Sequence, residues 1–150
     1  MKQNLFHGIW HYFALLLLFI ASCTARFSPG TNLNSTEQAI TVKIMETSAG
    51  NILVDAENMT LYVFRGDSPG ISNCYGSCAS LWPPLTSSDG LPPGRGPKVT
   101  GALGLIKRDN SSYQVTYNDE PLYTYAGDKK PGDTNGNGLY SFGNYWFVLD

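Results

Sequence analysis

The side chains in this sequence that could do chemistry fall into two small groups. Cys74 and Cys78 form a Cys-x-x-x-Cys pair, a spacing open to a disulfide, a thiol redox couple or a soft-metal site. Asp67 and Asp128 each follow a glycine, and two carboxylates in one cleft can serve as a general acid and base or hold a cation. The fold decides whether either pair comes together.

Histidine is confined to the amino terminus. Both histidines, His7 and His11, lie within residues 1–22, so residues 23–150 contain none. A Ser-His-Asp or Cys-His arrangement then has no base, and zinc or haem has no imidazole ligand. The sequence therefore predicts no catalytic residues, no metal site and no cofactor, and we expect a protein that is not an enzyme.

The amino terminus has the pattern of an export signal. Residues 12–21 are an apolar run, too short to cross a bilayer whose hydrocarbon core is about 30 Å thick. The sequence Ile20-Ala21-Ser22-Cys23 resembles a bacterial lipobox, in which the cysteine receives a diacylglycerol group and becomes the first residue after cleavage. The alternative is an ordinary signal peptide with a chance cysteine. We expect a lipoprotein signal peptide over residues 1–22 and lipidation at Cys23.

The segment that follows predicts a flexible tether. Residues 23–38 are polar, lack periodicity and are broken by Pro29-Gly30, a composition typical of a linker. Thr24 stands where an aspartate would resemble an inner-membrane retention signal. In an organism with two membranes, an anchored protein is therefore slightly favoured at the outer one.

The rest of the chain contains an internal repeat. The stretch Leu61–Asp67 returns as Leu122–Asp128, 61 residues later, and at that offset Val42–Asp67 aligns without a gap on Leu103–Asp128. Two copies are too few for a solenoid or a propeller. We expect both copies to pair within one domain over residues 39–150.

The pattern along each copy indicates β structure. Short segments with alternating apolar residues, bounded by turn residues, are typical of half-buried strands. The predicted fold is all-β: two related antiparallel β-meander units packed into one compact domain, with repeat 1 at about 40–85, a Gly/Pro-rich loop at 86–100 and repeat 2 at about 101–150. Strands are expected at about 40–45, 52–55, 60–64, 102–107, 113–117, 122–125 and 145–149.

A motif of the form Tyr-x-aromatic-x-x-Asp occurs once in each copy. Together with Cys74-Tyr-Gly-Ser-Cys78 and Trp82-Pro-Pro-Leu, it resembles the bacterial secreted-repeat lipoproteins that carry a Yx(FWY)xxD motif. The resemblance covers residues 50–149, roughly, and implies a cell-envelope location without an established activity. The motif residues are Tyr62, Phe64 and Asp67, then Tyr123, Tyr125 and Asp128, with Trp82 after the first copy.

Each motif position has a structural and a functional interpretation. The tyrosine and the second aromatic residue share one face of a strand, so these rings fill the core between the repeats or line an aromatic cleft for a glycan or a small ligand. Asp67 and Asp128 accept backbone N–H bonds in turns, or they act as a hydrolase pair. The hydrolase alternative requires carboxyl groups within about 5–9.5 Å of each other.

The cysteines allow a geometric test. In an extended strand, Cys74 and Cys78 would lie about 13 Å apart, whereas a disulfide needs Cα atoms within about 6.8 Å. The chain between them must therefore turn, and we expect a structural disulfide that packs on Trp82. The alternative is an envelope thiol-disulfide or copper-handling protein using the same pair.

Two other features refine the prediction. The segment Asp133–Gly138 matches the opening of a calcium loop but lacks its bidentate glutamate, so a plain turn is favoured over a loose calcium site. The formal net charge is −2 without a Lys/Arg run, which argues against nucleic acid. We expect a lipid-anchored cell-envelope protein with a binding or structural role, whose partners are the membrane and either an envelope protein or a small ligand.

Overall fold

The computed structural model describes residues 41–48 and 50–150, which belong to one compact unit. The predicted signal peptide, the tether and Cys23 lie outside the described residues. Within the part of the chain that the structure describes, no helix is long and apolar enough to cross a membrane. The fold is all-β, as predicted, with a single short helix among the described residues.

Each repeat begins with an antiparallel hairpin. In repeat 1, β1 (Thr41–Thr47) pairs with β2 (Gly50–Val54), and in repeat 2, β6 (Leu103–Lys107) pairs with β7 (Tyr113–Tyr117). Apolar residues on one face of each strand pack inward because strand side chains alternate between faces. The structure therefore confirms the repeat.

The two hairpins are not related by a constant offset. Ile44 lies opposite Leu53 in repeat 1, and Leu105 lies opposite Val115 in repeat 2. The first strands are thus 61 residues apart and the second strands 62, because the turn from β6 to β7 is one residue longer. The next turn is one residue shorter, which restores the offset at the motif. The gapless alignment was wrong along the second strands, where both residues still point into the core.

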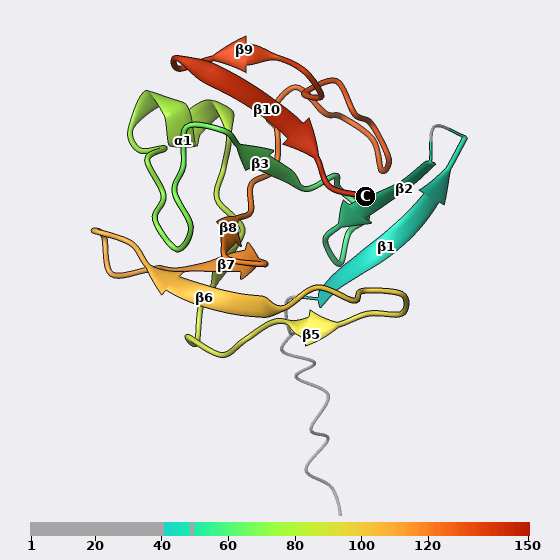
Figure 1. The fold of residues 1–150 in the computed structure, drawn as a ribbon, viewed down its shortest axis with the longest axis horizontal. Coiled ribbons are helices and arrows are strands. Elements are labelled where there is room, and N and C mark those ends of the chain that lie inside the picture. Colours follow the sequence, from blue (N-terminus) through green and yellow to red (C-terminus); the bar gives the residue numbers. More distant parts are fainter. Residues whose placement is uncertain (1–40, 49) are drawn as a thin grey trace, which may run out of the picture. The chain divides into compact units, whose positions relative to one another are not determined.

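The two units are interleaved instead of being separate meanders. The third strand of repeat 1, β3 (Tyr62–Phe64), pairs with β10 (Asn144–Val148) from the end of repeat 2. Conversely β4 (Thr86–Ser87), at the end of repeat 1, pairs with β7 of repeat 2. Figure 1 shows β3 and β10 side by side although they are far apart in the sequence. Each repeat therefore completes the other.

Short elements fill the remaining edges. β8 (Glu120–Pro121) pairs with β7, and β9 (Tyr140–Ser141) pairs with β10. β5 (Gly94–Arg95) runs parallel to β1 at the edge of that sheet, a place where a Gly/Pro-rich segment is tolerated. The helix α1 (Ser77–Leu81) contains Cys78 and ends directly before Trp82.

The motif strand faces two hydrophobic clusters at once. Leu61 and Val63 point into an aliphatic cluster, while Tyr62 and Phe64 point into an aromatic one. This division follows from the two-residue period of a strand. The aliphatic cluster contains Val42, Leu53, Leu61, Val63, Val99, Val115, Tyr117 and Leu122. The aromatic cluster contains Tyr62, Phe64, Cys74, Cys78, Trp82, Tyr123 and Trp146.

Candidate functional site

The motif tyrosines meet at the centre of the domain. The Tyr62 N–H donates to the Tyr123 carbonyl oxygen at 2.8 Å, and the Tyr123 N–H donates back to the Tyr62 carbonyl oxygen at 3.0 Å. Both side chains are fully buried. This exchange relates the repeats by an approximate two-fold axis that passes between the two tyrosines.

Each tyrosine reaches the aspartate of the other repeat. The Tyr62 hydroxyl donates to Asp128 Oδ2 at 2.6 Å, and the Tyr123 hydroxyl donates to Asp67 Oδ2 at 2.6 Å. Hydrogen bonds to a carboxylate are shorter and stronger than those between neutral groups. The motif is thus a reciprocal clamp, in which the tyrosine and the aspartate of one copy serve different partners.

The remaining oxygen of each carboxylate holds a turn. Asp67 Oδ1 accepts the backbone N–H of Asn73 at 2.7 Å. Asp128 Oδ1 accepts the backbone N–H of Asn135 at 3.0 Å and its side-chain amide at 3.1 Å. The predicted turn role of both aspartates is confirmed.

The glycine before each aspartate makes room for a ring. A Cβ atom on Gly66 would lie 2.4 Å from the Phe64 ring, and one on Gly127 would lie 2.2 Å from the Tyr125 ring. Any larger residue would displace the ring, because real Cβ contacts are not that short. The aromatic-x-Gly-Asp spacing therefore closes the turn tightly beneath the second aromatic residue.

Four rings form one stack across the repeats. Trp82 and Trp146 lie parallel with centroids 3.9 Å apart. Phe64 stacks on the outer face of Trp146 and Tyr125 on that of Trp82, each at 4.3 Å. Stacked aromatic pairs add about 0.5–1.5 kcal/mol each beyond their buried area. The predicted core role is confirmed for Tyr62, Phe64 and Tyr123, which are buried and therefore do not line a cleft, whereas Tyr125 is half-buried at the edge of the cluster.

Burial also sets the protonation of the clamp. Desolvation, together with the hydrogen bond to the facing carboxylate, raises the pKa of the Tyr62 and Tyr123 phenols far above the ordinary value. Both tyrosines therefore remain donors at any physiological pH. Burial raises the pKa of the Asp67 carboxyl as well, while its bonds from Tyr123 and Asn73 lower it in part.

The cysteines form the predicted disulfide. The Cα atoms of Cys74 and Cys78 lie 5.2 Å apart, because Gly76 adopts a positive φ of 56° and α1 begins directly after it. The Cys74 side chain is fully buried and that of Cys78 is 5% exposed. Both cysteines and Trp82 belong to one cluster of buried residues, so the loop packs on this tryptophan as expected.

One buried charged residue was not predicted from the sequence. Arg108, which lies between the expected strands at 102–107 and 113–117, is only 4% exposed. Its guanidinium donates to Ser72 Oγ at 2.7 Å, and also to Gln114 Oε1 and the Cys74 carbonyl. It lies over the Tyr75 ring at 4.2 Å. Arg108 thus joins the disulfide loop of repeat 1 to β7 of repeat 2, a contact between segments that no local pattern could reveal.

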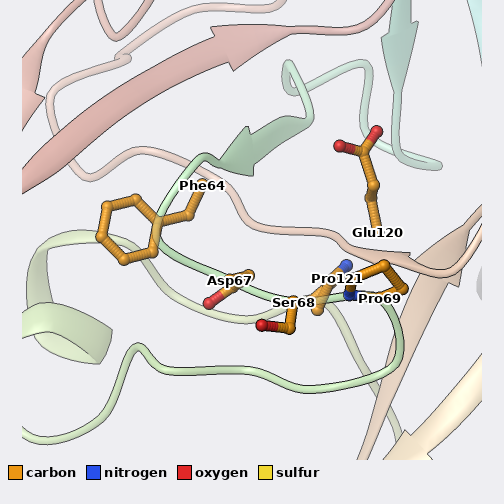
Figure 2. A pocket seen from close by; sticks show the side chains of 6 residues that line it. All are labelled: Phe64, Asp67, Ser68, Pro69, Glu120 and Pro121. Atoms are coloured by element: carbon orange, nitrogen blue, oxygen red, sulfur yellow. The ribbon is translucent and has the colours of Figure 1, made fainter.

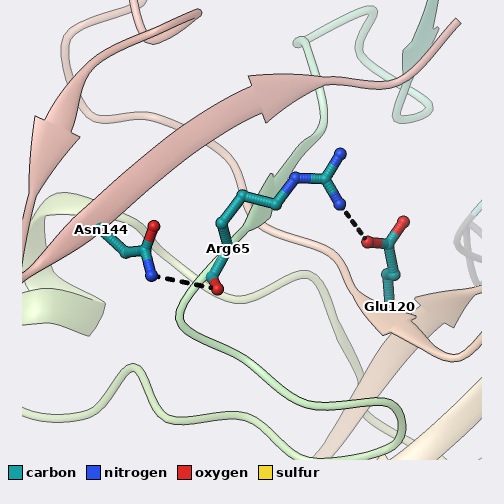
Figure 3. A network of polar contacts seen from close by, with 3 residues as sticks. All are labelled: Arg65, Glu120 and Asn144. Atoms are coloured by element: carbon teal, nitrogen blue, oxygen red, sulfur yellow. Dashed lines mark hydrogen bonds and ion pairs between the residues drawn. The ribbon is translucent and has the colours of Figure 1, made fainter.

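A small pocket adjoins Asp67. It is lined by the turn at Phe64–Pro69 and by Glu120 and Pro121 of β8, and its volume is about 60 Å³. Figure 2 shows the Glu120 carboxylate pointing away from Asp67, and Figure 3 shows it turned to Arg65, where the ion pair measures 2.9 Å. Pockets that bind small molecules are commonly about 300–1,000 Å³. This pocket lies well below that range.

A second depression lies at the carboxyl end of β10. Its volume is about 360 Å³, and its lining is mostly amide, hydroxyl and backbone groups, with Asp150 the one ionisable side chain. It holds no acid and base pair. The lining residues are Gly50, Asn51, Ile52, Thr134, Asn137, Val148 and Asp150.

The calcium-like segment is held by separate bonds. Asp133 Oδ2 accepts the backbone N–H groups of Lys129 and Lys130, and Asn137 Oδ1 accepts that of Val148. These oxygens serve different turns and do not converge. Among the described residues, no three His, Cys, Asp or Glu side chains are placed to hold a metal ion.

A further set of residues missed from the sequence lies on the β9–β10 hairpin. Tyr140, Phe142 and Tyr145 are all exposed there. The turn at Phe142-Gly143 lacks the Asn or Asp that usually precedes glycine in a two-residue hairpin turn, so only the glycine marks it in the sequence.

Comparison with known proteins gives one match. The family described as a secreted repeat of unknown function matches residues 43–86 and again residues 104–150. Each match contains one copy of the motif and the tryptophan that follows it. No curated protein and no solved structure matches the chain.

Proposed function

Because the chain belongs to the family of secreted repeats of unknown function, and is therefore an extracellular or cell-envelope protein, we propose that it is lipid-anchored through Cys23. In this proposal the anchor lies on the extracytoplasmic side of a membrane, the outer one where two exist. The folded domain is a binding or structural module and has no catalytic activity.

The observation that carries the module proposal is the reciprocal clamp. The groups most suited to chemistry, the Tyr62 and Tyr123 hydroxyls, donate at 2.6 Å to the carboxylates of Asp128 and Asp67 respectively. The first of these bonds is buried and the second is partly buried. Each carboxylate accepts further bonds from a turn. A catalytic carboxylate must reach its substrate within about 2.6–3.2 Å, so these groups support a frame better than a reaction.

The alternatives gain less support from the same residues. A thiol-disulfide or copper-handling protein needs an accessible cysteine pair, whereas Cys74 and Cys78 are buried in the aromatic cluster. A hydrolase needs both aspartates open to one cleft, whereas Asp128 is 6% exposed and Asp67 adjoins a pocket of about 60 Å³.

The anchor is supported by the residues that precede Cys23. Small residues, Ala21 and Ser22, come directly before this cysteine at the end of an apolar run. A single acyl chain binds a bilayer only marginally, at about 0.8 kcal/mol per buried CH₂ group, and two chains make the attachment stable. Two or three chains on Cys23 would hold the domain at the membrane.

Fractionation and mass spectrometry test the anchor. We expect the mature protein to sediment with membranes and to carry the mass of a diacylglycerol-modified cysteine as its first residue. The Cys23→Ser variant should lose both properties. An unmodified, membrane-free wild-type protein would contradict lipid anchoring.

Thiol trapping tests the module against the redox alternative. In the folded protein under mild reduction, Cys74 and Cys78 should resist alkylation and react only after unfolding. Rapid alkylation of the reduced, folded protein, prevented when an oxidant is added first to re-form the disulfide, would favour a redox role instead.

A further inference from the structure

The β9–β10 hairpin carries an exposed row of aromatic rings. Tyr140 is 63% exposed, Tyr145 48% and Phe142 47%. The Tyr145 ring lies near-parallel to Phe147, at 28° and 6.1 Å between centroids, while Tyr140 stands at 69° to Tyr145, 5.0 Å away. Tyr140 therefore stands at a steep angle beside Tyr145, and the Phe147 ring lies near-parallel to Tyr145 on the same strand. Contiguous exposed apolar surface of this kind marks binding sites more often than folding requirements.

The backbone at the tip of the hairpin is strained, and the Phe142 side chain there is exposed. Phe142 has a φ of 52° and Gly143 a φ of 87°, which is the two-residue turn that favours Asn-Gly. A bulky residue at positive φ is a conformational outlier, and such outliers gather at functional sites. Phe142 therefore destabilises its turn and presents a ring to solvent, which is the opposite of what folding alone would favour.

The charge of the surface defines what it can bind. Residues 134–149 contain no Asp, Glu, Lys or Arg. The nearest charges neutralise each other, since Arg65 lies 5.6 Å above the Phe147 ring and pairs with Glu120 (Figure 3). An anionic polymer needs a concentrated basic surface, and this surface offers none. It matches a neutral ligand with a flat C–H face and hydroxyl groups, because aromatic faces attract positively polarised C–H edges.

We propose that the β9–β10 hairpin binds a strand of neutral polysaccharide. One sugar ring stacks on Tyr145, and the edge of this sugar lies against Tyr140. Phe142 contacts the next part of the polysaccharide chain, beyond the hairpin tip. The phenolic hydroxyls and the Arg65–Glu120 pair supply hydrogen bonds for sugar hydroxyls. The inference rests on the proposed function, since it names the ligand class of the proposed binding module.

Calorimetric titration of the full mature chain tests this inference. The protein is kept in a detergent without a sugar headgroup and titrated with three neutral hexasaccharides: chitohexaose, cellohexaose and maltohexaose. We expect at least one to bind, and Tyr145→Ala and Tyr140→Ala each to weaken that binding tenfold or more. Tyr113→Ala, which removes another exposed tyrosine, 38% exposed on β7, is the matched control and should bind as the wild type does.

Phe142→Asn separates binding from folding. Asparagine suits the turn, so this variant should melt at a higher temperature than the wild type while binding the sugar several-fold more weakly. A lower melting temperature would mean that Phe142 supports the fold, and unchanged affinity would remove it from the site. Either result would overturn the role given to the tip.

Three further outcomes decide the proposal. Absence of binding to all three sugars, or equal binding by the tyrosine variants, would overturn it. Binding of phosphatidylcholine vesicles through Tyr140 and Tyr145, without sugar binding, would overturn it in favour of a membrane surface. The Cys23→Ser result is independent: an anchored chain that binds no sugar contradicts this inference alone, and a sugar-binding chain without acylation contradicts the anchor alone.

Discussion

The segments that follow the two motif aspartates begin and end alike but differ in between. After Asp67 the chain forms a disulfide loop and α1, with both cysteines buried, and it ends at Trp82 in the ring stack. After Asp128 it forms a longer turn and a hairpin with exposed rings, and it ends at Trp146 in the same stack. The motif thus forms the same framework in both repeats. The two repeats differ in the segment between the motif aspartate and the following tryptophan, and a difference in their functions is best sought there.

The two tryptophans also differ in the hydrogen bonding of their indole N–H groups. Trp82 Nε1 donates to Ser141 Oγ of β9 at 3.1 Å. The equivalent Trp146 Nε1 is buried and has no hydrogen-bond partner among the described residues. The hairpin of repeat 2 therefore accepts a hydrogen bond from the indole N–H of Trp82 in repeat 1. The disulfide segment of repeat 1 accepts no such bond from Trp146.

The largest effect should come from the residue that fixes the disulfide segment to repeat 2. Arg108→Met should lower the free energy of unfolding by about 3–5 kcal/mol, because it leaves Ser72, Gln114 and the Cys74 carbonyl without their charged donor. Denaturant unfolding measures this loss. Lys107→Met, next to it on an exposed position, is the control and should have little effect.

Opening the disulfide should have the next largest effect. The Cys74→Ala/Cys78→Ala variant should lose about 2–3 kcal/mol, since closing so short a loop gives about 2 kcal/mol and the smaller side chains leave space beside Trp82. The hairpin of repeat 2 has no such covalent closure. A variant as stable as the wild type would show that the disulfide does not hold the segment.

The two halves of the clamp should be energetically equivalent. Tyr62→Phe and Tyr123→Phe should each cost about 2 kcal/mol, because each leaves a carboxylate oxygen, buried in Asp128 and half-buried in Asp67, without its donor. In double-mutant cycles, Tyr62 should couple to Asp128 and Tyr123 to Asp67. Coupling of Tyr62 to Asp67 of its own repeat would contradict the crossed arrangement.

A smaller effect should follow from the hydrogen bond that only one tryptophan has. Ser141→Ala should cost about 1–2 kcal/mol, because it leaves the buried Trp82 N–H unpaired. Ser77→Ala, at the corresponding place in repeat 1, should cost less. Thermal unfolding of the two variants provides the comparison, and equal losses would mean that the asymmetry has no energetic weight.

The smallest effect should be a change in pH dependence. Burial raises the pKa of Asp67 above its ordinary value of 3.8, so its contribution to stability is fully present below that value and is lost as the pH rises through the raised pKa. The unfolding free energy of the wild type minus that of Asp67→Asn should therefore fall as the pH increases from below 3.8. A difference that rises over this range would contradict the burial effect.

Local sequence patterns located the repeated frame but not its contacts. The alternation around Tyr62 predicted a strand, and β3 was found there. The strand predicted over 122–125 was wrong, because Tyr123 makes only isolated bridges to Tyr62 and Pro84, although both tyrosines are buried as expected. The Cys74–Cys78 spacing required a turn, and the disulfide closes one. The crossed bonds of these tyrosines could not be predicted, because their partners lie more than 50 residues away and depend on how the repeats dock.

The all-β class, the turn role of the aspartates and the cysteine loop followed from local residue patterns, and the repeat followed from matching one half of the chain to the other. Only the folded domain shows that β10 completes repeat 1, that Arg108 is buried, and that Tyr140, Phe142 and Tyr145 are exposed while Tyr62, Phe64 and Tyr123 are buried. The physical reason is that burial is a property of the assembled domain. An aromatic residue has the same pattern in a core strand and in a surface hairpin until the other repeat covers one of them.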